Sequence, residues 1–321
     1  MAPRGPNEVD RTIHNSATGK ALETARQHEA EETLKLYAGW FCPFVQRTWI
    51  TLQEKHIDYQ YIEINPYHKD PEFLKLNPRG LVPTLAVPLP TVNAASHLNT
   101  NGDSALKKDR QLKPLYESIV IAEYLDEHFS DVSKYGPRLL PEGDDELAAY
   151  ERARCRLWID HISSRIVPAF YRFLQHTPEK DSQYTVTDAR SDLLGAIKTF
   201  IEQLLEMDNE RESLKQKPGP WFLGDRFSLV DITLIPWALR LFLIDHYKKP
   251  DGVGIPEPGE GAADNEIWNR WRMWFAEVQK RDSVTSTMSE RQKYIEVYKR
   301  YAEDETGSQV GQATRGGRSM P

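Results

Sequence analysis

Apolar residues follow two different periods along the chain, and the change from one to the other divides the sequence into two parts. In the first part, short β-rich segments with alternating apolar positions are separated by turn residues. The predicted strands are 34–37, 58–64, 81–87 and 112–116. Helical spacing begins at Pro43, recurs over 71–76, and runs from Glu117 to about residue 130. The pattern predicts a small α/β unit with a βαβ start.

From about residue 142, every periodic segment has the helical period. The predicted helices are 145–176, 187–210, 228–246, 265–280 and 289–303. Ser228 and Asp231 have the spacing of a capping box, which marks one helix start firmly. The sequence therefore predicts an α/β domain followed by an all-helical domain.

Four polar segments interrupt or flank these domains. We expect residues 1–32 to form a flexible N-terminal arm and residues 304–321 a disordered tail. Residues 88–111 predict a polar hairpin insertion, and 250–264 a loop rich in Gly and Pro. The expected domains are thus 33–131 and 142–303.

Composition excludes several function classes. The 321 residues are 39% hydrophobic and carry a net charge of -7, with no basic stripe to follow a phosphate backbone. No run approaches the ~20 apolar residues that span a bilayer. The N-terminal segment lacks an apolar signal core and is not acid-poor, so the expected location is cytoplasmic. Nucleic acid and membrane are not expected partners.

The chain has only two cysteines, Cys42 and Cys155, so neither a disulfide framework nor a zinc site is predicted. His161 and His176 have no metal-ligand partners at suggestive spacing. Cys42 precedes Pro43 and would lie at or beside a helix N-cap, where free amides favour a thiolate and lower a cysteine pKa. Val45 occupies the position of a resolving cysteine. A mixed disulfide on Cys42 would then be cleared by an outside thiol, for which glutathione is the abundant candidate. The alternative is an ordinary buried cysteine.

Two further motifs suit a peptide ligand. A cis peptide at Val82-Pro83 would turn the Val82 backbone toward an extended peptide, although a trans proline in a turn is the commoner arrangement. Glu117 and Ser118 lie at a strand-to-helix junction, where a hydroxyl and free amides suit a carboxylate and Glu117 an ammonium. The alternative for this pair is a plain helix cap.

Together these motifs have an order and spacing that resemble the cytosolic glutathione transferases, closest to the omega class and its fungal omega-like relatives. The resemblance rests on Cys42-Pro43-Phe44, on 77–83 (Asn-Pro-Arg-Gly-Leu-Val-Pro) and on Glu117-Ser118 with the helix after it. It spans about 34–130 strongly and the helical domain more loosely. It implies a thioredoxin-like glutathione-binding domain with a mixed four-stranded sheet, and a helical domain that shapes the pocket of the second substrate.

The resemblance also implies roles for residues. Cys42 would be the nucleophile and Phe44 a wall of the glutathione site. Val82, before Pro83, would pair with the cysteine of glutathione, and Glu117 with Ser118 would hold its γ-glutamyl end. Trp237 falls where the family often has an aromatic wall of the substrate pocket, with core packing as its alternative. The omega pattern has lysine directly before the proline of the short second helix, but here Asp70 precedes Pro71 and Lys69 stands one place earlier.

Three functions follow from this reading. The first is a glutathione-dependent thiol transferase that reduces disulfides or dehydroascorbate, or acts on glutathionyl conjugates, through Cys42. The second is a transferase that conjugates or cleaves an electrophile in a biosynthetic or detoxification pathway. The third is a non-catalytic, glutathione-binding regulatory protein. A Cys42 thiol that titrates near or above about 8.5 would favour the third. Glutathione is the expected cosubstrate, without a metal, and the family usually forms homodimers.

Overall fold

The N-terminal domain is built on a mixed four-stranded sheet. The structure is a computed structural model that describes residues 13–90, 110–181, 183–215, 217–250, 252–260, 264–318 and 320. The strands are β1 (Lys35–Ala38), β2 (Gln60–Glu63), β3 (Thr84–Pro90) and β4 (Arg110–Leu115), in the order β2-β1-β3-β4. β1 runs parallel to β2 and antiparallel to β3, and β3 is antiparallel to β4. The predicted mixed sheet is confirmed.

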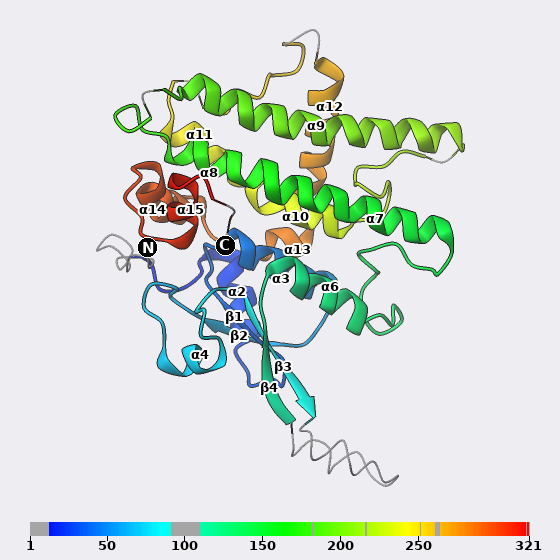
Figure 1. The fold of residues 1–321 in the computed structure, drawn as a ribbon. Helices are drawn as coiled ribbons and strands as arrows, with labels where there is room; N and C mark the ends of the chain where they lie inside the picture. Colours follow the sequence, from blue (N-terminus) through cyan, green and yellow to red (C-terminus); the bar gives the residue numbers. More distant parts are fainter. Residues whose placement is uncertain are drawn as a thin grey trace.

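Helices cover both faces of this sheet. Helix α3 (Pro43–Glu54) and helix α6 (Ser118–His128) pack side by side between the sheet and the helical domain, whereas α4 (Pro71–Leu76) lies on the other side (Figure 1). Pro43 occupies the first turn of α3, where its missing N–H leaves no hydrogen bond unmade. The carboxyl end of β1 therefore leads through Gly39-Trp40-Phe41 directly into Cys42 and α3.

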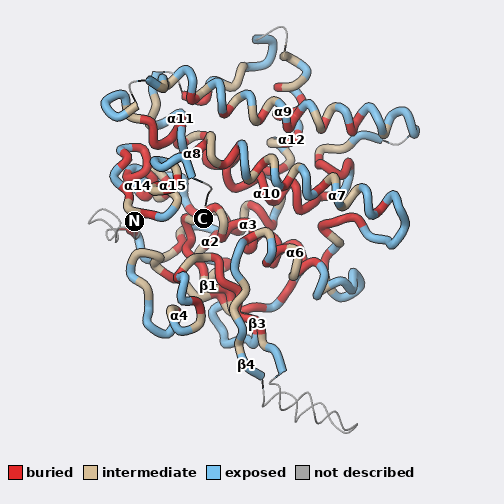
Figure 2. The backbone as a smooth tube through the Cα atoms, viewed as in Figure 1, coloured by how far each residue is buried: buried red, intermediate tan, exposed pale blue. Residues whose placement is uncertain are grey.

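The second domain is helical, as predicted. Its elements are α7 (Glu146–His161), η1 (Ile162–Ile166), α8 (Val167–Gln175), α9 (Val186–Ser213), α10 (Leu229–Ala238), α11 (Leu241–Tyr247), α12 (Asn265–Val278), α13 (Asp282–Thr285) and α14 (Arg291–Ala302). The capping box is present, since Ser228 Oγ accepts from the Asp231 amide and Asp231 accepts from the Ser228 amide. Buried residues concentrate where α10 meets α3 (Figure 2).

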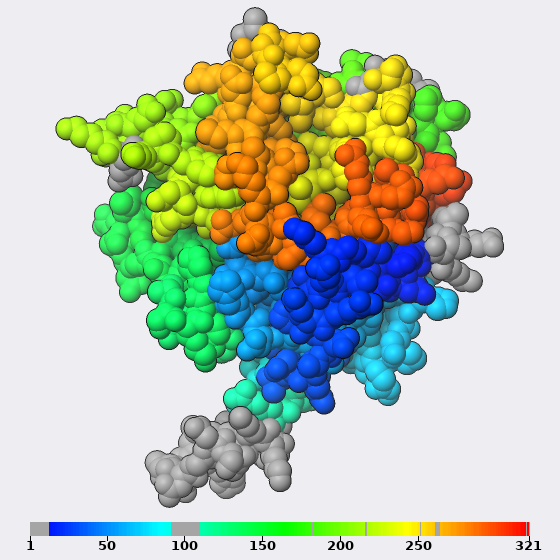
Figure 3. Space-filling model, turned by 180° about the vertical axis from the view of Figure 1, so that it is seen from behind, coloured from blue at the N-terminus to red at the C-terminus, as the bar shows by residue number. Residues whose placement is uncertain are grey.

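The N-terminal segment from residue 13 is not a free arm. Helix α2 (Gly19–Gln27) lies against the segment before α14, and Figure 3 shows these first residues packed beside the C-terminal helices. The Ala21 amide donates to the Met288 carbonyl at 3.1 Å, and Thr24 Oγ1 donates to the Ser286 carbonyl at 2.8 Å. The prediction of a flexible arm over 1–32 is wrong for residues 13–32, because contacts distant in sequence hold them; residues 1–12 lie outside the described part.

The prediction of a disordered tail over 304–321 is wrong for residues 304–318. Helix α15 (Gln309–Arg315) follows α14, and it begins at Ser308, whose hydroxyl accepts from the Gly311 amide. Asp304 anchors the segment through Lys180 at 2.8 Å and Arg315 at 2.7 Å. Ion pairs and packing, which composition does not reveal, stabilise this segment.

The two other polar segments are described in part. β3 extends to Pro90 and β4 starts at Arg110, so the ends of the predicted insertion 88–111 belong to the sheet, and residues 91–109 lie outside the described part. Residues 252–260 of the predicted loop 250–264 contain neither helix nor strand. Within the described ranges, no helix combines the length and the apolar character needed to cross a membrane.

Candidate functional site

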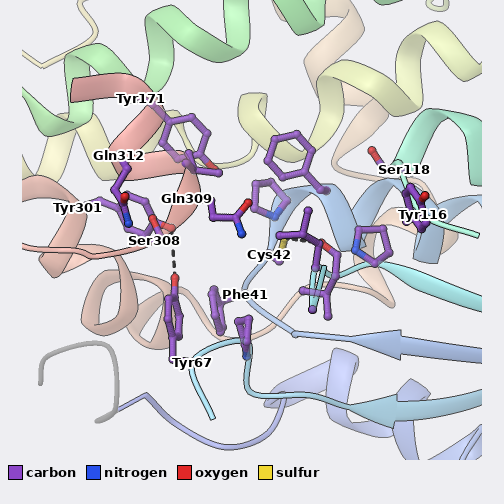
Figure 4. A pocket seen from close by; sticks show the side chains of 18 of the residues that line it. Phe41, Cys42, Tyr67, Tyr116, Ser118, Tyr171, Tyr301, Ser308, Gln309 and Gln312 are labelled. Atoms are coloured by element: carbon purple, nitrogen blue, oxygen red, sulfur yellow. Dashed lines mark hydrogen bonds between the residues drawn. The ribbon is translucent and has the colours of Figure 1, made fainter. Parts of the chain in front are cut away.

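A cavity of about 280 Å³ lies between the two domains, and the Cys42 side chain lines it (Figure 4). Its first wall comes from the α/β domain. This wall includes Phe41, Cys42, Pro43, Phe44, Pro66, Tyr67, Lys69, Gly80, Leu81, Val82, Pro83, Tyr116, Glu117 and Ser118. The structure therefore brings together the three motifs that the sequence singled out, which lie 75 positions apart from Cys42 to Glu117 in the chain.

Cys42 is the N-cap residue of α3. Its backbone is extended, and its amide donates to the Gly39 carbonyl at 2.9 Å, so the turn after β1 fixes where the thiol stands. The thiol donates to the Val82 carbonyl at 3.9 Å, across the cavity floor. The sulfur therefore faces the segment that the sequence assigns to a peptide-like ligand.

Burial raises the pKa of the Cys42 thiol above its ordinary value. The amides of Val45 and Phe44 and the charges of Arg240 and Arg47 all act in the opposite direction, but they do not outweigh the loss of solvation. The predicted lowering of this pKa is therefore wrong. A sequence pattern reveals a helix start but not how far the surrounding protein removes the thiol from solvent.

Val82 precedes β3, and its peptide bond to Pro83 is cis. Asn77 is buried beneath this loop, where its side-chain amide donates to the Leu81 carbonyl at 3.3 Å and to Thr84 Oγ1 at 2.9 Å. Asn77 thus holds the loop that presents Val82, while the Val82 backbone stays outside the sheet's hydrogen-bonded register. The backbone is arranged to meet an extended ligand.

Glu117 and Ser118 lie at the start of α6, where the Glu117 side chain makes no cap hydrogen bond. Glu117 is the N-cap residue of α6 with a φ of +69°, a conformation uncommon outside glycine and often found at functional sites. Its carboxylate pairs with Arg79 at 2.8 Å. Ser118 is the first helical residue, buried, and its hydroxyl accepts from Arg47 Nη1 at 3.4 Å. Both residues line the cavity at the amino end of α6.

Lys69 also lines the cavity. The next residue, Asp70, stands where the omega pattern has a lysine before the proline. Asp70 caps α4, since its carboxylate accepts from the Glu72 amide at 2.7 Å. The Lys69 side chain crosses Gly80, where an added Cβ would lie 2.8 Å from Nζ. Partial burial lowers the pKa of Lys69. An ammonium group therefore lies on the cavity wall beside Gly80.

Phe44 is part of the cavity wall, but Trp237 lies behind it. The two rings meet edge to face with centroids 5.0 Å apart, and Trp237 is only 1% exposed. The Arg47 guanidinium packs over the Trp237 ring at 4.4 Å. The prediction of Trp237 as a pocket wall is therefore wrong for this cavity, and its alternative, core packing, describes the residue.

The second wall comes from the helical domain, and its residues were not predicted. It consists of Tyr171 on α8, Tyr298 and Tyr301 on α14, and Gly307, Ser308, Gln309, Val310 and Gln312 around α15. The Tyr301 and Tyr67 hydroxyls share a hydrogen bond of 3.4 Å that closes one side (Figure 4). The three-residue spacing of Tyr298 and Tyr301 could have marked a tyrosine face on this helix. Nothing comparable marks Ser308 or Gln309.

Among the residues that the structure describes, no group of three or more His, Cys, Asp and Glu side chains could hold a metal ion. The cavity instead offers a thiol, backbone groups at Val82, a helix start at Ser118 and an ammonium at Lys69. This set suits an extended ligand that carries charges at both ends.

Comparisons with known proteins agree on the family. The chain matches the family model of the glutathione S-transferase N-terminal domain over residues 41–128 and that of the C-terminal domain over 183–277. Glutathione S-transferase omega-1 from Sus scrofa is 30% identical over 211 residues, which are 66% of this chain and 68% of the relative.

Solved structures extend the comparison to most of the chain. Glutathione transferase Omega 3C from Trametes versicolor is 34% identical with a TM-score of 0.65, over 90% of this chain and 99% of that one. A tau-class glutathione S-transferase from mango, at 20% identity and a TM-score of 0.60, covers 85% of this chain and all of its own, and shares the fold. The chain belongs to the glutathione S-transferase family, whose members use glutathione as cosubstrate, and to its omega-like class.

Proposed function

We propose that the protein is a glutathione-dependent thiol transferase with Cys42 as nucleophile. The observation that carries the proposal is the placement of the Cys42 sulfur in the cavity, opposite the Val82 carbonyl. Cys155, the other cysteine of the chain, is fully buried in α7 and does not line the cavity. A one-thiol site of this kind relies on an outside thiol for turnover.

Two exchanges complete the reaction. The Cys42 thiolate attacks the glutathionyl sulfur of a mixed disulfide, forms a Cys42–glutathione disulfide and releases the substrate as a thiolate, which takes up a proton. A second glutathione thiolate then attacks the glutathionyl sulfur, leaves as oxidised glutathione and frees the Cys42 thiolate. One free glutathione is consumed for each glutathionyl mixed disulfide reduced, because the substrate's own glutathionyl group supplies the other half of the oxidised glutathione. Dehydroascorbate or a disulfide without glutathione would consume two glutathione molecules, and a glutathionyl conjugate would be reduced through the same covalent intermediate.

The cavity wall supports the binding half of the proposal. The Val82 backbone would pair with the cysteine residue of glutathione, next to Cys42. Ser118 and the amino end of α6 would receive the γ-glutamyl carboxylate, with Glu117 at the ammonium. Lys69 would receive the glycine carboxylate, and Phe44 would pack against the ligand.

The raised pKa of Cys42 favours the alternative of a non-catalytic binding protein. Against that alternative, the Cys42 thiol lines the cavity and two amides at the start of α3 act on it, which an inert core cysteine does not need. Cys155 shows the contrast, because it is buried within α7 and burial raises its pKa to about 12, although Arg226 and Arg154 act to lower it. Turnover measurements decide between the two functions.

The test compares Cys42→Ser with the wild-type protein. A mixed disulfide of glutathione and 2-mercaptoethanol is the substrate, and oxidised glutathione is followed by coupled NADPH oxidation. We expect Cys42→Ser to lose at least about a hundredfold in rate because serine forms no disulfide. Cys155→Ala is the matched control and should keep the wild-type rate. A Cys42→Ser protein with normal turnover would overturn the proposal.

A second candidate is the conjugation or cleavage of an electrophile with glutathione. The observation that favours it is the second wall, where Tyr171, Tyr298 and Gln309 offer aromatic and hydrogen-bonding contacts to a small molecule beside the thiol. Incubation of the protein with glutathione and a panel of quinones and aryl ethers tests it by mass spectrometry. Adducts or cleavage products that persist in Cys42→Ser would establish this chemistry as separate from thiol transfer.

We also propose a cytoplasmic location and a homodimer. Reduced glutathione, on which the second exchange depends, is abundant in the cytosol. Helices α6 and α7 present large exposed apolar side chains, Val120, Leu147, Tyr150 and Leu157, on neighbouring elements. Such a patch is typical of an interface between protein chains.

A further inference from the structure

Two arginines are buried beneath the Cys42 loop without an acidic partner. Arg47 is 2% exposed and Arg240 is 1% exposed, yet within the described residues no carboxylate lies within 4 Å of either guanidinium. Arg47 Nη2 and Arg240 Nε have no hydrogen-bond partner there. By contrast, the buried Arg270 pairs with Asp208 at 2.6 Å. The two unpaired cations therefore need an explanation.

Both guanidinium groups are fixed around the start of α3. Arg240 donates to the Phe41 carbonyl at 3.3 Å and to Gln46 Oε1 at 2.5 Å, so it spans the residues on either side of Cys42. Arg47 lies on α3 itself and donates to the Thr233 carbonyl at 2.9 Å. Because neutral oxygens are their partners, these contacts orient the cations without neutralising them.

A buried charge without a counter-charge is strongly unfavourable, so proteins pair such charges or leave them where an anion forms. The titratable groups that face Cys42 from the neighbouring elements are Tyr171 on α8, Tyr298 on α14 and the two arginines. Among the described residues of the cavity wall, the one carboxylate, that of Glu117, already pairs with Arg79. Both guanidinium charges act on the Cys42 thiol.

We propose that Arg47 and Arg240 are positioning residues that provide the counter-charge of the Cys42 thiolate and keep this partly buried thiol ionisable. The inference deepens the proposed function and rests on it. It explains how the site can hold a nucleophile on the cavity wall, where loss of solvation alone would leave an inert thiol.

The electrostatics of the pair are consistent with this role. Burial lowers the pKa of Arg47 to about 9, which leaves it charged at neutral pH, and the interaction with Cys42 opposes that lowering. Both guanidiniums in turn act to lower the pKa of Cys42. At an effective dielectric constant of about 20, a unit charge within several ångströms shifts a pKa by about one to two units.

The experiment measures the rate of Cys42 alkylation by iodoacetamide between about pH 6 and 10, without glutathione. A Cys155→Ala background removes the second thiol. We expect Arg240→Met and Arg47→Met each to raise the pKa of Cys42 by about one unit or more, and to slow alkylation at pH 7.5 about tenfold. Arg240→Lys and Arg47→Lys, which keep the charge, should retain most of the wild-type pKa.

Arg270→Met is the matched control, because it removes a buried arginine on α12 away from the cavity and should leave the pKa of Cys42 unchanged. If Arg240→Met does not fold, Arg240→Gln is used, since its amide can still donate to Phe41 while the charge is lost. Folding of each variant is checked by circular dichroism.

The inference is overturned if the folded neutral variants keep the wild-type pKa, or if the lysine variants shift it as far as the methionine variants do. Because alkylation needs neither glutathione nor turnover, this result is independent of the proposed function. If the wild-type protein has thiol transferase activity but the neutral variants leave the pKa of Cys42 unchanged, the counter-charge role is wrong and the proposed function stands.

Discussion

Gly80 shows how one residue without a side chain places a functional group. Its φ is +62°, and a Cβ there would lie 2.7 Å from Lys69 Cδ and 3.0 Å from Leu74 Cδ2. Gly80→Ala should displace the Lys69 ammonium and destabilise the fold by about 1 kcal/mol or more. We expect the KM for glutathione to rise several-fold with a smaller change in kcat, as steady-state kinetics would measure.

Gly259→Ala is the control for Gly80→Ala. Gly259 also has a positive φ, +87°, but nothing lies within 4 Å of the position of its Cβ. The Gly259→Ala variant should be less stable because of backbone strain, but its KM for glutathione should not change. Equal KM values for glutathione in the two variants would show that Lys69 does not contribute to binding.

The Glu63 carboxylate, at the end of β2, makes the free energy of unfolding depend on pH. Its carboxylate accepts from the Trp40 amide and from the Tyr61 hydroxyl, both at 2.9 Å, and burial raises its pKa to about 7. The folded state therefore binds this proton more tightly than the unfolded chain, whose glutamate titrates near 4.3. The resulting stability is fully present below about pH 4.3 and is lost as the pH rises through about 7.

Glu63→Gln should remove that contribution. The free energy of unfolding of the variant, measured relative to wild type by urea titration, should rise by up to about 3 kcal/mol from pH 4.5 to pH 8. Glu72→Gln, an exposed carboxylate on α4, is the control and should leave this difference nearly constant. The same pH profile for wild type and Glu63→Gln would contradict the assignment.

For single residues, the sequence predicts which ones belong to the site better than it predicts the surroundings of each side chain. Cys42, Val82 and Ser118 could be located because a proline, a turn and a helix start leave local signals. The direction of the Cys42 pKa shift and the burial of Trp237 could not, since both depend on how closely α3 and α10 pack. Local pattern fixes the type of residue at a site, whereas tertiary packing fixes its solvation.

At the scale of elements, α15 adds a wall to the cavity that the sequence did not predict. Ser308, Gln309 and Gln312 belong to the wall opposite Val82, and Asp304 ties the segment to the helical domain. Removal of residues 305–321 should therefore open the second-substrate side. We expect the KM for a bulky second substrate to rise about tenfold or more, as kinetics with a series of mixed disulfides would measure.

The truncated protein also provides a control for the glutathione site, because Val82, Ser118 and Lys69 remain in it. Exposure to oxidised glutathione should still give a single adduct on Cys42 by mass spectrometry. If the truncated protein kept wild-type KM values for every second substrate, α15 would have no part in specificity.

The long helices could be predicted, and so could the short α4, which a proline opens, whereas α2 and α15 could not. Helix α9 and the helices from α7 to α8 have enough turns for an apolar stripe to stand out, and Ser228 with Asp231 marks the start of α10. Helices α2 and α15 have nine and seven residues and mostly polar side chains. Isolated helices of this length are marginal, so tertiary contacts such as Ala21 with Met288 decide whether they form.

At the scale of the molecule, the cavity belongs to neither domain alone. Its walls join residues 41–83 and 116–118 with Tyr171 and residues 298–312, and Arg47 links α3 to Thr233 on α10. The sequence predicts the first wall because a family pattern marks it. The second wall depends on the way the helical domain docks on α3, which leaves no local signal.

The exposed apolar face of α6 and α7 carries the prediction for the assembled protein. Leu147, Tyr150 and Leu157 are 68%, 63% and 69% exposed and fall within one side of α7, and Val120 on α6 is 53% exposed. Two Arg156–Glu123 hydrogen bonds, at 3.1 and 3.2 Å, connect the two helices. Burial of this face in a twofold dimer would remove it from water.

Leu157→Glu should therefore convert the dimer to a monomer, because a carboxylate would be buried at the interface without a partner. The molar mass is measured by light scattering coupled to size exclusion at micromolar concentration. Leu214→Glu is the matched control, since Leu214 is 70% exposed but lies at the end of α9, and its variant should stay dimeric. A wild-type protein that is monomeric under these conditions, or a Leu214→Glu variant that dissociates equally, would rule out the α6–α7 face as the interface.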